Sequence, residues 1–482
     1  MGDTRLFVDF GSTFTKLVAF DLDAEELLAR VQVPSTVEQD ITVGLDEAFS
    51  LLAQTVTVSE AERHNALACS SAAGGLRVVC VGLVPEYTTE AGRRAALGAG
   101  AKIVGSYSFE LTASELREIE DIAPDIVLLT GGTDGGNRKV ITHNAALLAG
   151  SGSGISNVIV AGNKSAYDEV EALFSGSGKD VTFTANVMPE IGVLEVDDAN
   201  GKIRDLFIER ITEAKGIGRA RDMIADVIMP TPAAVLEAAR LLADGSYGEE
   251  GLGELLLVDV GGATTDVYSV AKGTPTNAAV HFVGLPEPYA KRTVEGDLGL
   301  FHNLDTLREI LDVDAVPPGF DEAVAAMCAE NSVPRGDDQV ACHLLLSEAA
   351  VRSAVDRHAG SLRPVVTPNG EVWLQRGKDL TAVRWLLGAG GPISFSADPR
   401  RVLQGGLFDP TLPTLLKPKT PEMLLDRHYI LFALGLLAQS EPAAALRLMR
   451  KYVTPLAETE REPGEQNAAE PHRERTEEHV EI

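Results

Sequence analysis

The sequence predicts an α/β protein of two lobes related by duplication, and three observations lead to this prediction. Two segments 250 positions apart, 6–13 and 256–266, are closely similar. Each is a short apolar run that ends in Asp, followed by glycine and hydroxyl residues and then by a second β-type run. Elsewhere β-type runs alternate with helical stretches, a pattern typical of parallel α/β layers.

Composition indicates a globular protein without a basic binding surface. The chain has 482 residues, enough for about three domains, and 45% of them are hydrophobic. Lys and Arg total 42 against 71 Asp and Glu, a net charge of −29. This balance disfavours a nucleic-acid partner, and we expect a soluble cytoplasmic protein.

Cysteine usage and hydropathy exclude further classes of protein. The four cysteines form no CxxC pair and have no histidine at metal-ligand spacing, which disfavours both a zinc site and a disulfide framework. The first residues lack the basic and apolar regions of a signal peptide. No apolar stretch is long enough to span a membrane, so we expect no membrane association.

The first lobe is predicted to span residues 1–229. Three strands, near 6–10, 16–20 and 27–33, precede a helix from about 43 to 55. Between 76 and 186, β-type runs alternate with helices, and we expect an α/β insertion at about 85–150.

The second lobe is predicted to span residues 230–456. A helix opened by prolines runs from Pro230 to Leu242 and leads into the second copy of the repeat. We then expect a third strand at 278–283, a helical insertion at about 300–370, a strand at 382–387 and a helix pair at 420–452. Nine Glu from position 458 onward and no aromatic residue predict a disordered acidic tail at 457–482.

The two repeated loops carry residues suited to a nucleotide and its metal. An Asp at the end of a strand can hold Mg²⁺, usually through water. Glycine lets backbone N–H groups approach phosphate oxygens, hydroxyls add donors, and a lysine adds a point charge. The candidate catalytic and metal residues are Asp9 and Asp259, and the candidate phosphate-binding residues are Gly11, Ser12, Thr13, Lys16, Gly261, Gly262, Thr264 and Thr265.

A third glycine-rich loop follows the strand at 382–387. Its glycines, Gly388, Gly390 and Gly391, would let the backbone lie against a nucleoside. Taken alone, either repeated loop is more often an ordinary turn, and the third loop is as readily a tight turn as an adenosine site. Two similar loops in order, with a helix before the second and a glycine-rich loop after it, make chance an unlikely cause.

In this order the features resemble the superfamily of actin, sugar kinases and heat-shock chaperone ATPases. The resemblance implies two duplicated ribonuclease H-like lobes, mixed sheets flanked by helices, and ATP with Mg²⁺ bound between them. It also implies a second connecting helix at 427–438, with Gly435 as the small residue where the two connecting helices cross.

Four stretches, 70–76, 130–137, 160–164 and 293–299, resemble a narrower family, the glutamate mutase-associated proteins of the GlmL/MutL type, which are unrelated to the mismatch-repair protein. The resemblance implies an ATP-dependent, chaperone-like reactivating factor for an adenosylcobalamin-dependent mutase such as glutamate mutase. ATP hydrolysis would release damaged cobalamin, and the partners would be the mutase subunits.

No cobalamin ligand is evident in the chain itself. The Asp-x-His-x-x-Gly pattern of base-off cobalamin domains is absent, and residues 356–360 approach it with the glycine one position early. We therefore expect the cofactor to be handled on the partner.

The sequence allows two interpretations for the role of each of three acidic residues. Asp134, in the glycine-rich stretch 130–137, could face the nucleotide or the partner, or belong to a tight crossover. Glu295 and Asp297 could position the attacking water, for which Asp297 is the candidate catalytic residue, or cap a helix that runs toward Leu304.

Two other functions fit the same pattern. One is a small-molecule kinase or ATP-dependent amidohydrolase on this scaffold, with Asp134 or Asp297 as base. The other is a structural partner subunit that binds nucleotide without turnover.

Overall fold

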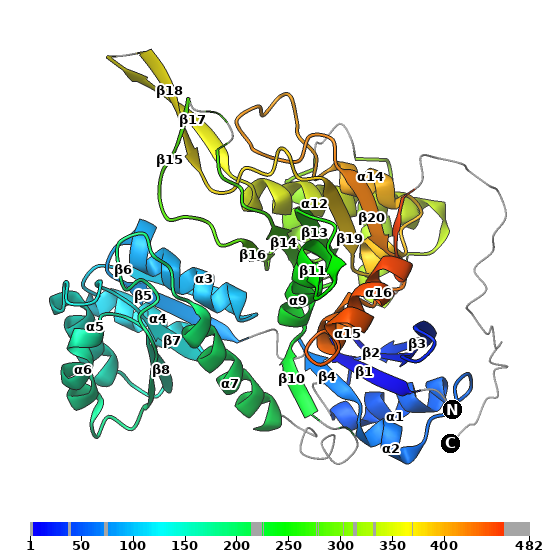
Figure 1. Cartoon of the computed structure of the whole chain (residues 1–482), viewed down its shortest axis with the longest axis horizontal. Coiled ribbons are helices and arrows are strands. Elements are labelled where there is room, and N and C mark those ends of the chain that lie inside the picture. Colours follow the sequence, from blue (N-terminus) through cyan, green and yellow to red (C-terminus); the bar gives the residue numbers. More distant parts are fainter. Residues whose placement is uncertain are drawn as a thin grey trace.

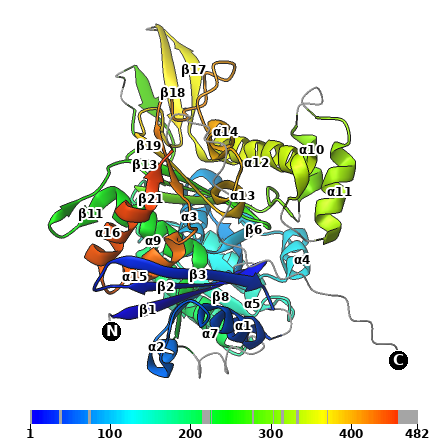
Figure 2. The ribbon, with the colours of Figure 1, turned by 90° about the vertical axis from the view of Figure 1, so that its right-hand side faces the viewer.

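The computed structural model describes residues 3–456 except 37–39, 72–75, 214–223, 225, 276, 278, 302, 312–315, 331–333 and 369. The predicted tail at 457–482 lies outside the described residues. In Figure 1 the α/β insertion lies at the left, the first lobe at the lower right and the second lobe above them, and Figure 2 shows the molecule turned by 90°. None of the described helices is long and apolar enough to cross a membrane.

The first lobe is built on a five-stranded mixed sheet of order β10-β4-β1-β2-β3. Strands β1, β2 and β3 are successive antiparallel neighbours, whereas β4 runs parallel to β1 and β10 parallel to β4. The elements of this lobe are β1 (Thr4–Phe10), β2 (Phe14–Asp21), β3 (Glu26–Pro34), α1 (Ile41–Leu52), α2 (Glu60–His64), β4 (Leu67–Ser70) and β10 (Asp226–Pro230).

The second lobe repeats this topology. Its sheet has the order β16-β14-β13-β19-β20-β21, with β13, β14 and β16 antiparallel in succession and β19 and β20 parallel to β13. When the strands of each lobe are numbered in the order in which they occur in the chain, the order across both sheets is 3-2-1-4-5. The strands are β13 (Leu255–Val260), β14 (Thr265–Val270), β16 (Ala290–Glu295), β19 (Trp385–Ala389), β20 (Glu422–Asp426) and the added β21 (Val453–Pro455).

This duplicated arrangement confirms the predicted fold class, two ribonuclease H-like lobes of mixed sheets flanked by helices. The prediction was wrong about one strand: the third strand of the second lobe is β16, whereas residues near 278–283 form β15 (Val280–Phe282) in a different sheet. The sequence of β16 hid it, because its charged side chains Lys291, Arg292 and Glu295 break the apolar pattern expected of a buried strand.

Two helices cross between the lobes, α9 (Thr231–Asp244) and α15 (Leu431–Leu437). A Cβ on Gly435 would lie 1.8 Å from the carbonyl oxygen of Ala234, so the crossing requires glycine there. Both predicted connecting helices and the role of Gly435 are thereby confirmed. The helix pair predicted from 420 is wrong at its start, because 422–426 is strand β20, and α16 (Pro442–Tyr452) completes the pair.

The α/β insertion lies between β4 and β10 and has its own all-parallel sheet of order β6-β5-β7-β8-β9. It is larger than the predicted 85–150, because the flanking strands join this sheet rather than the lobe. Its elements are β5 (Arg77–Gly82), α3 (Glu90–Gly98), β6 (Lys102–Ser108), α4 (Ala113–Ile122), β7 (Ile126–Leu129), α5 (Lys139–Ala149), β8 (Asn157–Val160), α6 (Tyr167–Phe174), β9 (Asp180–Phe183) and α7 (Asp197–Glu213).

The second-lobe insertion is only partly helical. After its helices the chain forms a hairpin that pairs with β15 in a three-stranded sheet projecting from the lobe (Figure 1, top). The prediction of a helical segment at 300–370 is therefore wrong beyond residue 360. The elements are α10 (Leu304–Glu309), α11 (Phe320–Glu330), α12 (Gly336–His358), β17 (Ser361–Thr367) and β18 (Gly370–Arg376).

Candidate nucleotide site between the lobes

A cavity of about 810 Å³ lies between the lobes, within the size range of small-molecule sites. The β1–β2 turn borders it on one side and the β13–β14 turn on the other. The start of α9, the segment 391–397 with the short helix α13 (Gly391–Ser394), and the loop at 427–429 complete this part of the wall. Ten of the predicted site residues line it: Asp9, Gly11, Ser12, Thr13, Lys16, Asp259, Gly261, Gly262, Thr264 and Gly391.

Four predicted residues do not line the cavity. The hydroxyl of Thr265 is buried and donates to the carbonyl of Leu298 at 2.7 Å. Gly388 lies within β19, against the side chains of Ile393 and Leu403. Gly390, with φ of +86°, lets the third loop turn so close to β13 that a Cβ would lie 2.5 Å from Asp259 Oδ1. The fourth is Asp297.

In the β1–β2 loop, the first of the two candidate phosphate loops, the carboxylate of Asp9 is neutralised by Lys16 on the neighbouring strand. Asp9 and Lys16 are partners in the β1–β2 register, and Lys16 Nζ lies 2.7 Å from Asp9 Oδ2. Thr231 Oγ1 of α9 donates to the other oxygen at 2.6 Å. Burial disfavours the charged ammonium, but the charge and hydrogen bond of Asp9, together with Tyr429 and Asp259, outweigh it, so the pKa of Lys16 is raised.

The second lobe reaches this ion pair through Tyr429. Lys16 Nζ lies 4.3 Å from the centre of the Tyr429 ring, a cation–π contact across the cavity. The backbone of Tyr429 has φ of +52°, which is uncommon for a residue other than glycine and is often found at functional sites.

In the second phosphate loop, the acid at the strand end faces another acid. Asp259 pairs in register with Asp266, which is held by Arg292 Nη2 at 2.7 Å and accepts from Thr264 Oγ1 at 2.9 Å. No donor among the described residues reaches the Asp259 carboxylate. Burial, and then the charge of Asp266, raise the pKa of Asp259 from 3.8 to about 7.

Sequence reasoning missed several residues of this site. Asp266 and Arg292 line the cavity, as do Thr231 and Tyr429. The signal for Asp266 was its position, 250 residues after Lys16 and therefore equivalent in the repeat. No local signal identifies Arg292, since it is recognised only when β16 is placed beside β14.

Asp426 was also missed, although it ends a β run as Asp9 and Asp259 do. It is buried, and its Oδ2 accepts from the backbone N–H groups of Ile430 and Leu431 at 2.8 and 2.9 Å. It therefore caps the start of α15 and holds the loop that carries Tyr429. Burial raises the pKa of Asp426 to about 6.

The acids with two readings lie away from the cavity wall. Arg357 binds Asp297 and Glu295 at 2.7 and 2.8 Å, and the residue before α10 is Asn303, so the capping role expected for these acids is wrong. Asp134 lies in the α/β insertion and forms an ion pair with Lys164 at 3.1 Å, within the turn network expected of a tight crossover.

Two ribonuclease H-like lobes that close on one cavity, each presenting a phosphate-type loop, define the two-lobed fold of actin-like ATPases and sugar kinases. The model of the MutL protein family matches residues 5–453. Over 459 residues the chain is 43% identical to "Protein MutL" of Clostridium tetanomorphum, covering 94% of this chain and 99% of the relative. The chain belongs to the MutL protein family.

Three solved structures are similar over most of the chain. One is the ethanolamine utilization protein EutJ from Carboxydothermus hydrogenoformans, with 10% identity, 92% of this chain and 90% of that chain covered, and a TM-score of 0.30. The second is the xylulose kinase from Bifidobacterium adolescentis, with 13% identity, 94% of each chain covered and a TM-score of 0.30. The third is the activator of 2-hydroxyisocaproyl-CoA dehydratase from Clostridium difficile with bound ADPNP, with 11% identity, 94% of this chain and 99% of that chain covered, and a TM-score of 0.28. With TM-scores of this size, the fold assignment rests on sheet topology.

Proposed function

We propose that this protein is an ATP-dependent, chaperone-like reactivating factor for an adenosylcobalamin-dependent mutase such as glutamate mutase. ATP binding and hydrolysis would drive release of damaged cobalamin from the mutase. The observation that carries the nucleotide part is the placement of both phosphate loops on one cavity, with Lys16 on one wall and Asp259 on the other.

The two loops have complementary chemistry toward a phosphate chain. Ser12 and Thr13 of the first loop and Gly262 of the second line the cavity, where hydroxyls and backbone N–H groups can donate to phosphate oxygens. Lys16 supplies a positive charge on the same side. The segment 391–397, which follows β19, lines the same cavity, where it can accommodate the nucleoside.

Asp259 fits Mg²⁺ better than Asp9 does. Its half-buried carboxylate has no donor among the described residues and faces Asp266, so a bound divalent cation would stabilise its charged form. Mg²⁺ is usually held by one or two carboxylates together with waters and phosphates, and Asp259 can supply one such carboxylate. When bound, Mg²⁺ would screen the phosphate charge.

The crossing of α9 and α15 suits rotation of the lobes. At Gly435 the two backbones approach so closely that no Cβ fits between them, and α15 packs against β1 and β4 of the first-lobe sheet whereas α9 packs chiefly against β13, β14 and β16 of the second. Hydrolysis in the cavity would change the contacts that join the loops, and the lobes would turn about this crossing.

The mutase part of the proposal is supported by family membership and by where the family-like stretches lie. Stretch 130–137 is in the α/β insertion, and 293–299 runs along β16 and beyond, beside that insertion. The described part of stretch 70–76, residues 70, 71 and 76, lies at the entry to the insertion. We infer that the insertion recognises the partner protein while the lobes bind nucleotide.

One feature supports the alternative of a small-molecule kinase or amidohydrolase. The cavity extends beyond the phosphate loops to Lys102, Phe301 and His343, which come from the insertions or next to them. Burial lowers the pKa of His343 to about 4, so its imidazole is neutral at pH 7. This end of the cavity has room for a small acceptor.

The test combines purified protein, Mg²⁺-ATP and a cobalamin mutase inactivated by turnover. We expect ATP hydrolysis and recovery of mutase activity, both abolished in Asp9→Ala and Asp259→Ala. Asp134→Asn, an acid in a glycine-rich loop outside the cavity, is the matched control for hydrolysis. Wild-type protein that neither binds nor hydrolyses ATP, with or without the mutase, would refute the proposal, and a phosphorylated small molecule would favour the kinase.

A further inference from the structure

Helix α3 of the α/β insertion contacts the two lobes through different chemistry. On one side, Ala91, Ala95 and Ala96 are buried in a hydrophobic core that also contains residues of the first-lobe sheet. On the other side, α3 lies along β16 of the second lobe, and the contacts described there are polar. Among the described residues, Leu285 is the one second-lobe member of that core, so the insertion is held to the first lobe by extensive apolar packing and to the second lobe chiefly by hydrogen bonds and ion pairs.

The inner polar contact passes through Arg292, which is 5% exposed. Its Nε and Nη2 lie 2.8 and 2.7 Å from Asp266 Oδ1. Its Nη1 donates to the carbonyls of Leu97 and Ala101, both at 3.2 Å, at the C-terminal end of α3. A guanidinium is favoured there, because the last carbonyls of a helix lack intrahelical partners and carry partial negative charge.

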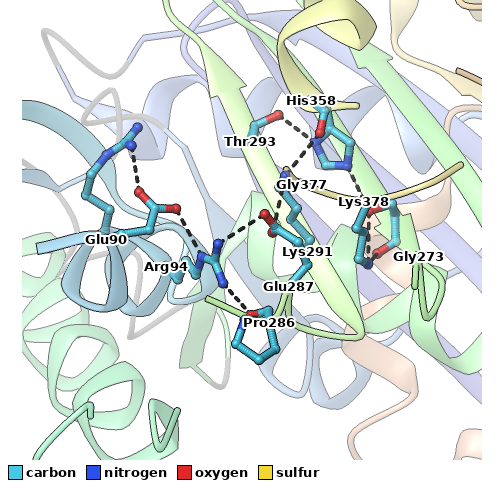
Figure 3. A network of polar contacts seen from close by, with 12 residues as sticks. Glu90, Arg94, Gly273, Pro286, Glu287, Lys291, Thr293, His358, Gly377 and Lys378 are labelled. Atoms are coloured by element: carbon cyan, nitrogen blue, oxygen red, sulfur yellow. Dashed lines mark hydrogen bonds and ion pairs between the residues drawn. The ribbon is translucent and has the colours of Figure 1, made fainter. Parts of the chain in front are cut away.

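The outer polar contact is the network in Figure 3. Arg94 of α3 lies 3.0 Å from Glu287, and its guanidinium also binds Glu90 on the same helix. Glu287 in turn lies 3.3 Å from Lys291 of β16, which donates to the carbonyl of His358 at 3.0 Å. This network joins the same two elements but does not include the phosphate loop.

Of the two polar contacts described, only the inner one includes residues that line the cavity. Thr264, Asp266 and Arg292 all line the cavity and are linked in sequence by hydrogen bonds. A phosphate or cation bound beside Asp266 must alter the charge that Arg292 balances. Because hydrogen bonds depend on direction and distance more steeply than apolar packing does, the contacts from Arg292 to α3 are the first to change.

We propose that Arg292 is a positioning residue that couples the second phosphate loop to helix α3. It orients Asp266 with one side of its guanidinium and fixes the end of α3 with the other, so the nucleotide state is transmitted to the α/β insertion. The proposal rests on the proposed nucleotide site and adds the route by which that site acts on the insertion.

Hydrogen–deuterium exchange of the full chain tests this route. The amides of Gly100 and Ala101, which close the end of α3 by donating to Leu97 and Ala96, report on it. Exchange is compared without nucleotide, with ADP and with a non-hydrolysable ATP analogue, each with Mg²⁺, while a fluorescent nucleotide measures the dissociation constant. We expect exchange at these amides to differ between nucleotide states by at least about fivefold, the low end of typical coupling.

Two matched variants locate the coupling. Arg292→Lys keeps a positive charge beside Asp266 but loses the planar group that reaches α3; measured at nucleotide concentrations that saturate the variant, whatever its dissociation constant, we expect no nucleotide-dependent difference at α3. Arg94→Lys makes the same change in the outer network and should keep that difference.

The outcomes separate the two proposals. Nucleotide binding to wild type with unchanged exchange at α3, or a full difference retained in Arg292→Lys, overturns the coupling alone. Absence of nucleotide binding to wild type overturns the proposed function and the coupling with it. The wild-type comparison does not depend on whether the variants fold.

Discussion

The two phosphate loops share a backbone and differ in charge. Each closes with a hydrogen bond from the glycine two residues after the Asp to the carbonyl three residues further on, at 3.1 Å in the first loop and 2.9 Å in the second. The residue paired with the strand-end Asp is Lys16 in one lobe and Asp266 in the other. Duplication thus kept the turn, whereas the electrostatics diverged.

This difference divides the work between the lobes. In the first loop the acid is neutralised within the hairpin, so Asp9 is a structural partner of Lys16 and Thr231. In the second loop Arg292 neutralises Asp266 but not Asp259, so the Asp259 carboxylate has no cationic partner among the described residues. We therefore expect changes in the first loop to affect stability as well as activity, and changes in the second loop to affect Mg²⁺-dependent activity alone.

The largest effect on stability is expected from Lys16→Met. The change leaves the Asp9 carboxylate, 1% exposed, without its cation, and breaking a buried pair costs about 3–5 kcal/mol of unfolding free energy. Urea denaturation measures this, and the double variant Asp9→Asn/Lys16→Met should recover part of the loss. A loss below about 1 kcal/mol, the range of exposed pairs, would show that the pair is not buried in solution.

Asp259→Asn should produce the opposite profile. Removing a charge that faces Asp266 should leave the unfolding free energy unchanged or higher, while Mg²⁺-dependent ATP hydrolysis falls by about 100-fold, as for loss of one preorganised electrostatic group. Paired denaturation and hydrolysis assays measure both quantities. If Asp259→Asn destabilised the fold as strongly as Lys16→Met, the contrast between the loops would be lost.

The pH dependence of nucleotide binding sharpens the same contrast. Because the pKa of Asp259 is raised to about 7, its carboxylate must lose a proton to hold a cation, so affinity for Mg²⁺-nucleotide should rise from pH 6 and level off above 7. The change is at most about tenfold per pH unit. Titration calorimetry at several pH values measures it, and Asp259→Asn should remove this dependence.

The raised pKa of Asp259 also makes the free energy of unfolding depend on pH. Folded Asp259 binds its proton more tightly than unfolded Asp259, whose pKa is near 3.8, so this group favours the folded state most at low pH. That contribution is lost as the pH rises from about 4 to 7. The difference in unfolding free energy between wild type and Asp259→Asn across this window isolates it.

The smallest effect is expected from Asp297→Asn. Asp297 and Arg357 are both more than a third exposed, and such pairs contribute at most about 1 kcal/mol. Hydrolysis should stay within about twofold of wild type, the rate equivalent of less than 0.5 kcal/mol. A tenfold loss of hydrolysis with an intact fold would restore the sequence-based reading of Asp297 as the residue that positions the attacking water.

Sequence alone predicted what is local and repeated. The two loops and the helix after Pro230 follow from turn chemistry and helix starts, each readable within a few positions, whereas the crossing at Gly435 was implied by the resemblance to the superfamily. The predicted Asp9, Lys16 and Asp259 line one cavity because duplicated hairpins place equivalent turns at the facing edges of the lobes.

What sequence missed depends on contacts between distant segments. Strand β16 was overlooked because Arg292 looks like a surface residue until Asp266 and the end of α3 are placed around it. The extent of the α/β insertion was underestimated because an apolar run does not show which sheet its strand will join. Asp297 was a candidate base because its partner Arg357 lies 60 residues away in the chain.

The position of the α/β insertion has a consequence for how the chain folds. The insertion separates β4, which ends at Ser70, from its neighbour β10, which begins at Asp226. The first-lobe sheet therefore cannot acquire its last strand during synthesis until the whole insertion has emerged. Pairings of such long sequence separation form slowly, and until then β4 is an open edge that can pair with other chains. Rapid independent folding of the insertion would bring the ends of β4 and β10 together and limit aggregation of the nascent protein.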